Sequence, residues 1–112
     1  MTTDKTGAQT TVTAEHQKYT IAVEGKTAGH ADYADRGDQR VFYHTEIDEA
    51  FAGQGLAGKL VRQALADTRA AGLRIVPVCP YVAKYLERHE EFADIADPVT
   101  PEIRKWLRAE LG

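Results

Sequence analysis

The glycine-rich run at residues 53–58, Gly-Gln-Gly-Leu-Ala-Gly, lies where the spacing of apolar residues changes. Upstream of it, apolar and polar residues alternate with the period of two that is typical of a half-buried strand. Downstream, the residues of one helical stripe are Leu56, Leu60, Val61, Ala64, Leu65 and Thr68. Glycines at the start of a helix let backbone N–H groups approach an anion, and the helix dipole adds positive potential. The run therefore predicts a phosphate-binding turn between a strand and a helix.

Three strands are predicted before this turn, at residues 18–23, 29–33 and about 40–47. Their connections are too short for crossovers, so the strands should form an antiparallel meander. In the third strand, strict alternation predicts two faces. One face would carry Val41, Tyr43, Thr45 and Ile47, and the other Phe42, His44 and Glu46.

After the turn, Gly72 is expected to end the first helix, and residues 73–79 read as a further strand. Pro77 removes a backbone donor, so this strand should be an edge or splayed from its neighbour. Helices are predicted at residues 81–89 and about 100–111, the latter with Thr100 as its cap. The strand–helix–strand unit should be a right-handed parallel crossover. The expected fold is α+β: a mixed sheet with helices packed on it.

The chain has 112 residues, which suits one domain at residues 16–112 behind a polar, Thr-rich segment at 1–15 that is expected to be a disordered tail. The net charge of −3 and the lack of a basic stripe argue against nucleic-acid binding. No apolar run is long enough to span a membrane, and no signal peptide is recognised, so a cytoplasmic location is expected. Cys79 is the single cysteine and the four histidines show no metal-ligand spacing, so no metal is expected.

The literal G-x-G-x-x-G spacing of the turn allows three interpretations. A dinucleotide fold would need an acid at the end of the next strand, where the chain has Val78, Cys79 and Pro80. A second interpretation is a hinge that merely lets a strand bend into a helix. The third is a turn that binds a pyrophosphate.

The third interpretation is carried by a resemblance to the GNAT superfamily of acetyl-CoA-dependent N-acetyltransferases. Their motif, Arg/Gln-x-x-Gly-x-Gly/Ala, resembles the segment that contains Gly55 and Ala57, with Ala52 in place of the first side chain. The run from Tyr43 to Ala57, followed by Pro77-Val-Cys-Pro-Tyr, looks like a small, single-domain GNAT-like branch with a cysteine at the end of the strand after the helix. The resemblance spans about residues 19–92. It implies a compact GNAT-like sheet in which the two parallel strands splay apart.

The resemblance implies acetyl-CoA as cosubstrate, with no metal. Since Ala52 offers no side-chain contact, the backbone of the turn would hold the pyrophosphate, at Gly53, Gln54, Gly55, Leu56, Ala57, Gly58 and Lys59. Pantetheine would lie against the preceding strand, at Thr45, Glu46, Ile47 and Asp48.

Catalytic candidates follow from the same resemblance. Cys79 would face the acyl group and accept it covalently, with His44 as its activating base and Glu46 as a weaker candidate base. Ordinary alternatives remain for each: a lone cysteine is commonly a small buried hydrophobe, and a strand histidine or carboxylate is commonly a packed or exposed surface group.

The leading hypothesis from the sequence is an N-acetyltransferase whose acceptor amine, on a small molecule or a protein, is unknown. A non-catalytic CoA-binding or regulatory module is the alternative. A generic anion-binding domain with no link to CoA is a third possibility.

Overall fold

The computed structural model describes residues 2–3 and 9–112. Within them, six strands form one sheet in the order of the sequence, so each strand pairs with the next along the chain. The strands are β1 (Thr2–Thr3), β2 (Gln9–Glu15), β3 (Lys18–Val23), β4 (Lys26–Arg36), β5 (Gln39–Ile47) and β6 (Arg74–Pro77). The first four pairings are antiparallel and β5–β6 is parallel. The predicted meander and parallel crossover are both confirmed.

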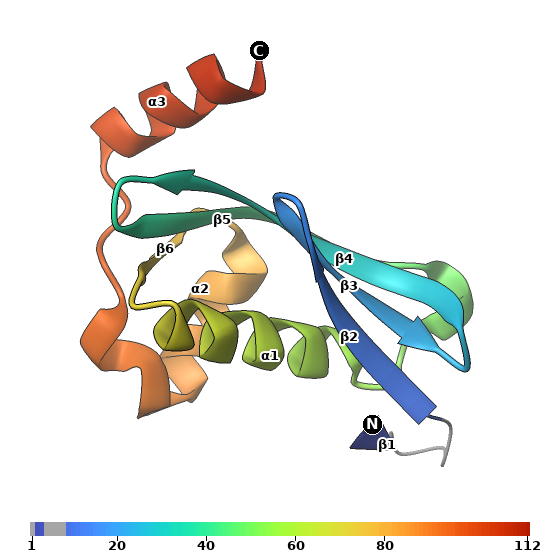
Figure 1. Cartoon of the computed structure of the whole chain (residues 1–112). Coiled ribbons are helices and arrows are strands. Elements are labelled where there is room, and N and C mark those ends of the chain that lie inside the picture. The colour runs from blue at the N-terminus through green and yellow to red at the C-terminus, as the bar shows by residue number, and fades with distance from the viewer. Residues whose placement is uncertain (1, 4–8) are drawn as a thin grey trace.

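The helices cover both faces of the sheet (Figure 1). Helices α1 (Leu56–Ala70) and α2 (Pro80–Arg88) pack on one face, and α3 (Pro101–Leu111) packs on the other. We call these the α1 face and the α3 face. Two short 3₁₀ helices, η1 (Glu49–Phe51) and η2 (Glu90–Ile95), lie in the connections. The α+β class expected from the sequence is confirmed.

Each face has its own apolar cluster. On the α1 face, the helical stripe predicted from the sequence is buried, including Leu60 and Leu65, which are both 0% exposed. On the α3 face, Val41 and Val76 pack against Ile103 and Leu107. Thr100 caps α3 as predicted, because its Oγ1 accepts a hydrogen bond of 3.1 Å from the N–H of Ile103.

The disordered tail predicted for residues 1–15 is wrong over Gln9–Glu15, which form β2 and pair with β3. Thr10 is buried and Val12 packs against the core, so one face of this strand is packed against the rest of the protein. The run of Thr and Val residues has high β propensity, which outweighs its polar composition. The remainder of the predicted tail lies outside the described residues, apart from the pairing of Thr2–Thr3 with β2.

A β-bulge in the β4–β5 pair changes which residues of β5 share a face. Phe42 pairs with Tyr33, and His44 pairs with Asp32, so the register gives Tyr43 no partner on β4. One extra residue reverses the alternation of side chains beyond it. The two faces predicted for β5 are therefore wrong after Tyr43.

Beyond the bulge, Thr45 and Ile47 share the α1 face with Phe42, and Ile47 packs against the core there. His44 and Glu46 lie on the α3 face instead. Periodicity alone could not reveal this reversal, because no residue in the strand marks the bulge.

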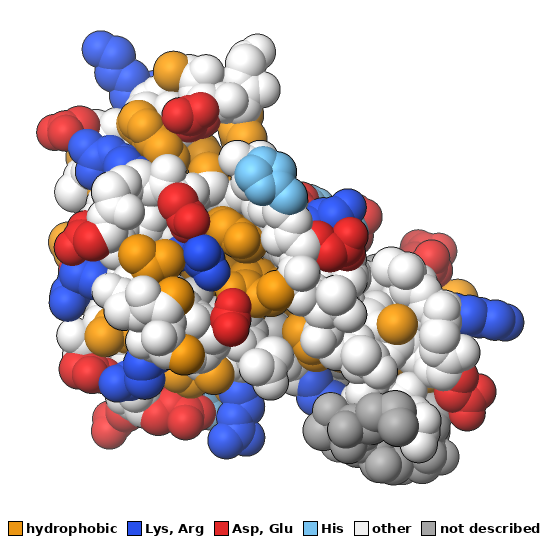
Figure 2. All heavy atoms as spheres, in the orientation of Figure 1, with side chains coloured by type: hydrophobic (Ala, Val, Ile, Leu, Met, Phe, Trp, Pro, Cys, Tyr) orange, Lys and Arg blue, Asp and Glu red, His pale blue; other side chains and the backbone are white. Residues whose placement is uncertain are grey.

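None of the described helices has both the length and the apolar character needed to span a membrane. In the view of Figure 2, acidic and basic side chains are interspersed over the surface.

Candidate functional site

The parallel strands β5 and β6 pair only over their first four residues, ending at Phe42 and Pro77. The N–H of Cys79 then donates a last hydrogen bond of 2.8 Å to the carbonyl of Phe42. Immediately afterwards Pro80 starts α2, since proline suits the first position of a helix and cannot continue the ladder. The strand β5 continues beside β4, so the two parallel strands diverge with Cys79 at the vertex of the gap.

Main-chain groups of β5 line this gap at alternate residues. The N–H of Asp48 donates to the carbonyl of Ala28 on the β4 side, at 2.7 Å. In an antiparallel ladder the direction of the main-chain groups alternates, so those of Glu46 also point toward β4. The N–H and C=O groups of Thr45 and Ile47 consequently point away from β4, toward the gap. Of the four residues predicted to contact pantetheine, only these two offer main-chain partners there.

Cys79 is 4% exposed and lies against Thr45. Its Sγ donates to Oγ1 of Thr45 over 3.4 Å. The β-bulge makes this contact possible, because it turns Thr45 toward the α1 face. The predicted pairing of Cys79 with His44 is wrong for the same reason: His44 lies on the α3 face, with its ring centroid 5.7 Å from that of His30.

The glycine turn leads into α1 with left-handed backbone at Gly53 (φ 81°) and at Gly55 (φ 73°), the residue that precedes the helix. Glycine accepts this region without strain. Among the described residues, no side chain caps the helix, and its first turn contains no acidic residue. The N–H groups of Leu56, Ala57 and Gly58 have no partner within the helix and lie at the positive end of its dipole.

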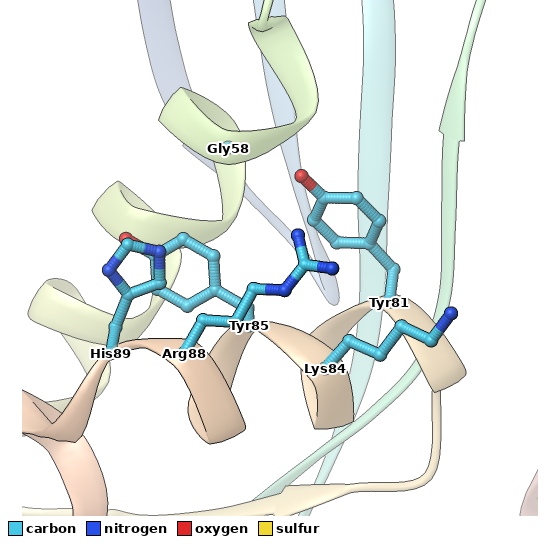
Figure 3. A pocket seen from close by; sticks show the side chains of 6 residues that line it. All are labelled: Gly58, Tyr81, Lys84, Tyr85, Arg88 and His89. Carbon is cyan, nitrogen blue, oxygen red and sulfur yellow. The ribbon is translucent and has the colours of Figure 1, made fainter.

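A pocket of about 170 Å³ lies between the start of α1 and α2 (Figure 3). Its lining residues are Gly58, Tyr81, Lys84, Tyr85, Arg88 and His89. The hydroxyl of Tyr81 points toward Gly58, and a Cβ built on Gly58 would lie 3.8 Å from that oxygen. The side chains of Lys84 and Arg88 bring two cations to this pocket.

Two stacked aromatic rings line the pocket at the C-terminal end of α2. The ring of His89 stacks on that of Tyr85, with centroids 4.1 Å apart. Burial, followed by the negative charge of Glu91, raises the pKa of Tyr85. The pocket therefore presents the cations of Lys84 and Arg88 and aromatic rings beside the first turn of α1, a combination suited to an organic phosphate.

The α2 side of the pocket was missed by the sequence reasoning. Tyr81, Lys84, Tyr85 and Arg88 recur at helical spacing, so their shared face was readable once residues 81–89 were assigned to a helix. The sequence alone does not show that this face of α2 lies beside the glycine turn.

Two predicted cofactor residues use their side chains elsewhere. Oδ1 of Asp48 accepts from the N–H of Ala50, which caps η1. Lys59 lines a separate hollow with Val12 and Arg62, and its Nζ is buried without a hydrogen-bond partner among the described residues. Only the backbone of Lys59 can take part in the turn as predicted.

Residues 18–95 match the sequence profile of a family described as GCN5-related N-acetyl-transferase. No curated protein matches the chain at a significant level.

Two solved structures share the fold. One is a GCN5-like protein from Staphylococcus aureus, with a TM-score of 0.63 and 19% identity over 81% of this chain and 91% of that one. The other is the ribosomal-protein-S18-alanine N-acetyltransferase from Escherichia coli, with a TM-score of 0.55 and 15% identity over 67% of this chain and 53% of that one. The profile covers well over half of the sequence, so the resemblance to the GNAT superfamily is confirmed: the chain belongs to the GCN5-related N-acetyltransferase family.

Proposed function

We propose that this protein transfers the acetyl group of acetyl-CoA to an amine, with the thioester held in the gap between β5 and β6. The observation that carries the proposal is the meeting of two features at one edge of the sheet. The uncapped start of α1 follows β5, and Cys79 follows β6. Because the strands are parallel, both features lie beyond the same ends of the sheet. A ligand with phosphates at one end and a thioester at the other fits this arrangement.

Each part of acetyl-CoA has a matching group. The pyrophosphate would accept hydrogen bonds from the backbone of residues 53–59, and Lys84 and Arg88 would add positive charge beside it. Pantetheine would pair with the main chain of Thr45 and Ile47, as an extra strand pairs with a sheet edge. The acetyl group would then lie at the vertex, beside the sulfur of Cys79.

Cys79 divides the transfer into two steps. The sulfur attacks the acetyl carbonyl and the bond from that carbon to the CoA sulfur breaks. The thiol proton passes by way of the Thr45 hydroxyl to the departing CoA thiolate. A neutral acceptor amine then attacks the acetyl-Cys79 thioester, and its proton returns to the Cys79 sulfur. The amine belongs to a small molecule or to a protein, and the predicted cytoplasmic location suits both.

Intact-mass spectrometry after incubation with acetyl-CoA tests this route. We expect one acetyl group per chain, released by hydroxylamine because a thioester is labile to it. Cys79→Ser is the control, and it should show no hydroxylamine-labile acetyl group while isothermal titration still detects acetyl-CoA binding. If the acetyl group is found only on lysines, in the wild type and in Cys79→Ser alike, the covalent step is refuted.

A non-catalytic CoA-binding module is the second candidate. It is favoured by the burial of Cys79 and by the location of His44 on the opposite face, which leaves the thiol with a hydroxyl rather than an imidazole as its contact. Acetyl-CoA binding without acetyl transfer, to Cys79 or to any offered amine, would establish this candidate. ADP competing as well as CoA would instead indicate a generic anion site, since pantetheine would then contribute nothing.

A further inference from the structure

A cluster of four side chains occupies the α3 face of the sheet just beyond the β-bulge. It consists of two successive cross-strand pairs, His30 opposite Glu46 and Asp32 opposite His44, and we call it the His30 cluster. The bulge creates it, because without the extra residue His44 and Glu46 would point to the other face. The acetyl-transfer proposal uses none of these side chains.

The ring orientation of His30 is fixed by Asp32. Nδ1 of His30 lies 3.0 Å from Oδ1 of Asp32. The carboxylate of Asp32 accepts this hydrogen bond, with Nδ1 of His30 as its donor. Nε2 is then the ring nitrogen on the side of Glu46. A carboxylate that holds one ring nitrogen while the other is free is the usual outer partner of a metal-binding histidine.

The distances to the two carboxylate oxygens of Glu46 are equal to or a few tenths of an ångström longer than the spacing of two ligands of one ion. Nε2 of His30 lies 3.4 Å from Oε2 of Glu46, and Nε2 of His44 lies 3.8 Å from Oε1. Both exceed the usual range of about 2.7–3.2 Å for an N–H···O hydrogen bond. Two ligands each about 2.1 Å from a tetrahedral zinc ion are separated by about 3.4 Å. Within the described residues, the ligand atoms of His30, His44 and Glu46 all lie within 4.8 Å of one another.

We propose that His30, His44 and Glu46 bind a divalent transition-metal ion of the Zn²⁺ type, with Asp32 orienting His30. Two imidazoles and one carboxylate suit Zn²⁺ and exclude Mg²⁺ as the preferred ion, since Mg²⁺ is bound by oxygen. Three protein ligands leave the fourth position of a tetrahedral ion open to water or a substrate atom.

The surroundings leave that fourth position accessible. The side chains of His44 and Glu46 are 51% and 63% exposed. A shallow pocket of about 150 Å³ adjoins His30 and Glu46, and residues Thr27, Ala28, Gly29 and Asp48 complete its lining. A molecule entering this pocket would reach an ion held by the cluster.

This site escaped the sequence analysis because its histidines are fourteen positions apart, on two strands. Spacing alone gave no metal-ligand pattern, and none was predicted. The register of the β4–β5 pair and the bulge at Tyr43 bring the ligands together, and neither is visible as a short motif.

Titration of the metal-free full-length chain with Zn²⁺ tests the proposal. We expect one ion per chain with a dissociation constant in the micromolar range or below. The substitutions His30→Ala, His44→Ala and Glu46→Gln should each weaken binding by about tenfold or more, and Asp32→Asn by about 10- to 100-fold. The control is His16→Ala, which removes an exposed histidine near the β2–β3 turn and should leave the affinity unchanged.

Two further readouts separate the site from loose surface binding. Co²⁺ in place of Zn²⁺ should give the intense visible absorption of a four-coordinate ion in the wild type and lose it in His44→Ala. Saturating Zn²⁺ should raise the melting temperature of the wild type, because the ion binds the folded chain. Binding only at high micromolar Zn²⁺, or equal affinity in the variant lacking all three ligands, would overturn the proposal. Neither readout involves acetyl-CoA, so this result is independent of the proposed acetyl transfer.

Discussion

A side chain at position 58 is expected to have opposite effects on the stability of the fold and on the binding of the cofactor. In the folded chain, a methyl group at this position would meet the Tyr81 hydroxyl at an ordinary contact distance of 3.8 Å, with no closer contact to another described element. Alanine is also a better helix former than glycine by up to about 1 kcal/mol. The added methyl group would, however, project into the pocket that we propose for the cofactor.

We therefore expect Gly58→Ala to leave the free energy of unfolding unchanged or up to about 1 kcal/mol higher, while it weakens acetyl-CoA binding by about tenfold or more. Urea unfolding and isothermal titration measure the two effects. Gly72→Ala is the matched control, because Gly72 has a φ of 74° at the far end of α1. It should cost about 1 kcal/mol of stability and leave the affinity unchanged. Unchanged affinity in Gly58→Ala would remove Gly58 from the binding site.

At the scale of elements, Asp97 joins the segment after η2 to the start of the parallel strand pair. Its carboxylate accepts from Nε of Arg74 on β6 at 2.7 Å and from Nε2 of Gln39 on β5 at 2.9 Å. Its N–H donates to the carbonyl of Ile75 at 2.8 Å. Burial disfavours the charged carboxylate, but the hydrogen bonds from Gln39 and Arg74 outweigh it and lower the pKa of Asp97.

A lowered pKa means that the unfolded chain binds the proton more readily than the folded one. The contribution of Asp97 to stability is therefore complete above its ordinary pKa of about 4 and is lost as the pH falls through the lower folded value. We expect Asp97→Asn to cost about 1 kcal/mol at neutral pH, with the difference from wild type vanishing well below pH 4.

Chemical unfolding at a series of pH values measures this difference. The control is Glu110→Gln, which removes an exposed carboxylate on α3 and should follow the wild-type curve. A cost for Asp97→Asn that stayed constant down to pH values well below 4 would contradict the role of the charge.

How much of the fold the sequence could predict depends on how local each signal is. The stripe of α1, the cap at Thr100 and the glycine at position 72 are short-range features, and the elements they mark lie where expected. The glycine turn likewise precedes α1 directly. The strand β2 was not predicted because the polar, Thr-rich composition of the segment indicated disorder, although Thr10 and Val12 alternate as in a strand.

The candidate site was harder to predict because it depends on register. The bulge at Tyr43 reverses the faces of His44 and Thr45, so the residue beside Cys79 is a threonine and not the expected histidine. A reversal of this kind is set by pairing with β4, which local periodicity does not report. The placement of Lys84 and Arg88 similarly depends on how α2 docks against α1.

At the scale of the whole molecule, α3 is the sole described helix on its face of the sheet, and it lies beyond residues 18–95, which match the family. Ile103 is 4% exposed and packs with Val41 and Val76, both 0% exposed. We expect Ile103→Ala to lower the free energy of unfolding by about 2–4 kcal/mol through the lost contacts and the cavity.

Urea unfolding followed by the fluorescence of Trp106, the single tryptophan, measures this loss at α3 itself. Acetyl-CoA affinity of the folded variant should match the wild type, because the proposed site is on the α1 face. Leu111→Ala, at a 55% exposed position on the same helix, is the control and should change stability little. If the fully folded Ile103→Ala variant binds acetyl-CoA more weakly than the wild type does, the α1 face and the α3 face are coupled.

The sequential order of the strands also determines when the proposed site comes into being. Each antiparallel pair closes a loop of a few residues, whereas β5 and β6 meet only after the whole of α1 has been placed between them. Closing the longer loop costs more chain entropy, so this parallel pair should form late in folding. The gap beside Cys79 then exists only in chains that have almost completed folding. A ligand bound there would slow unfolding while leaving the rate of folding nearly unchanged, because the transition state would not yet contain its binding site.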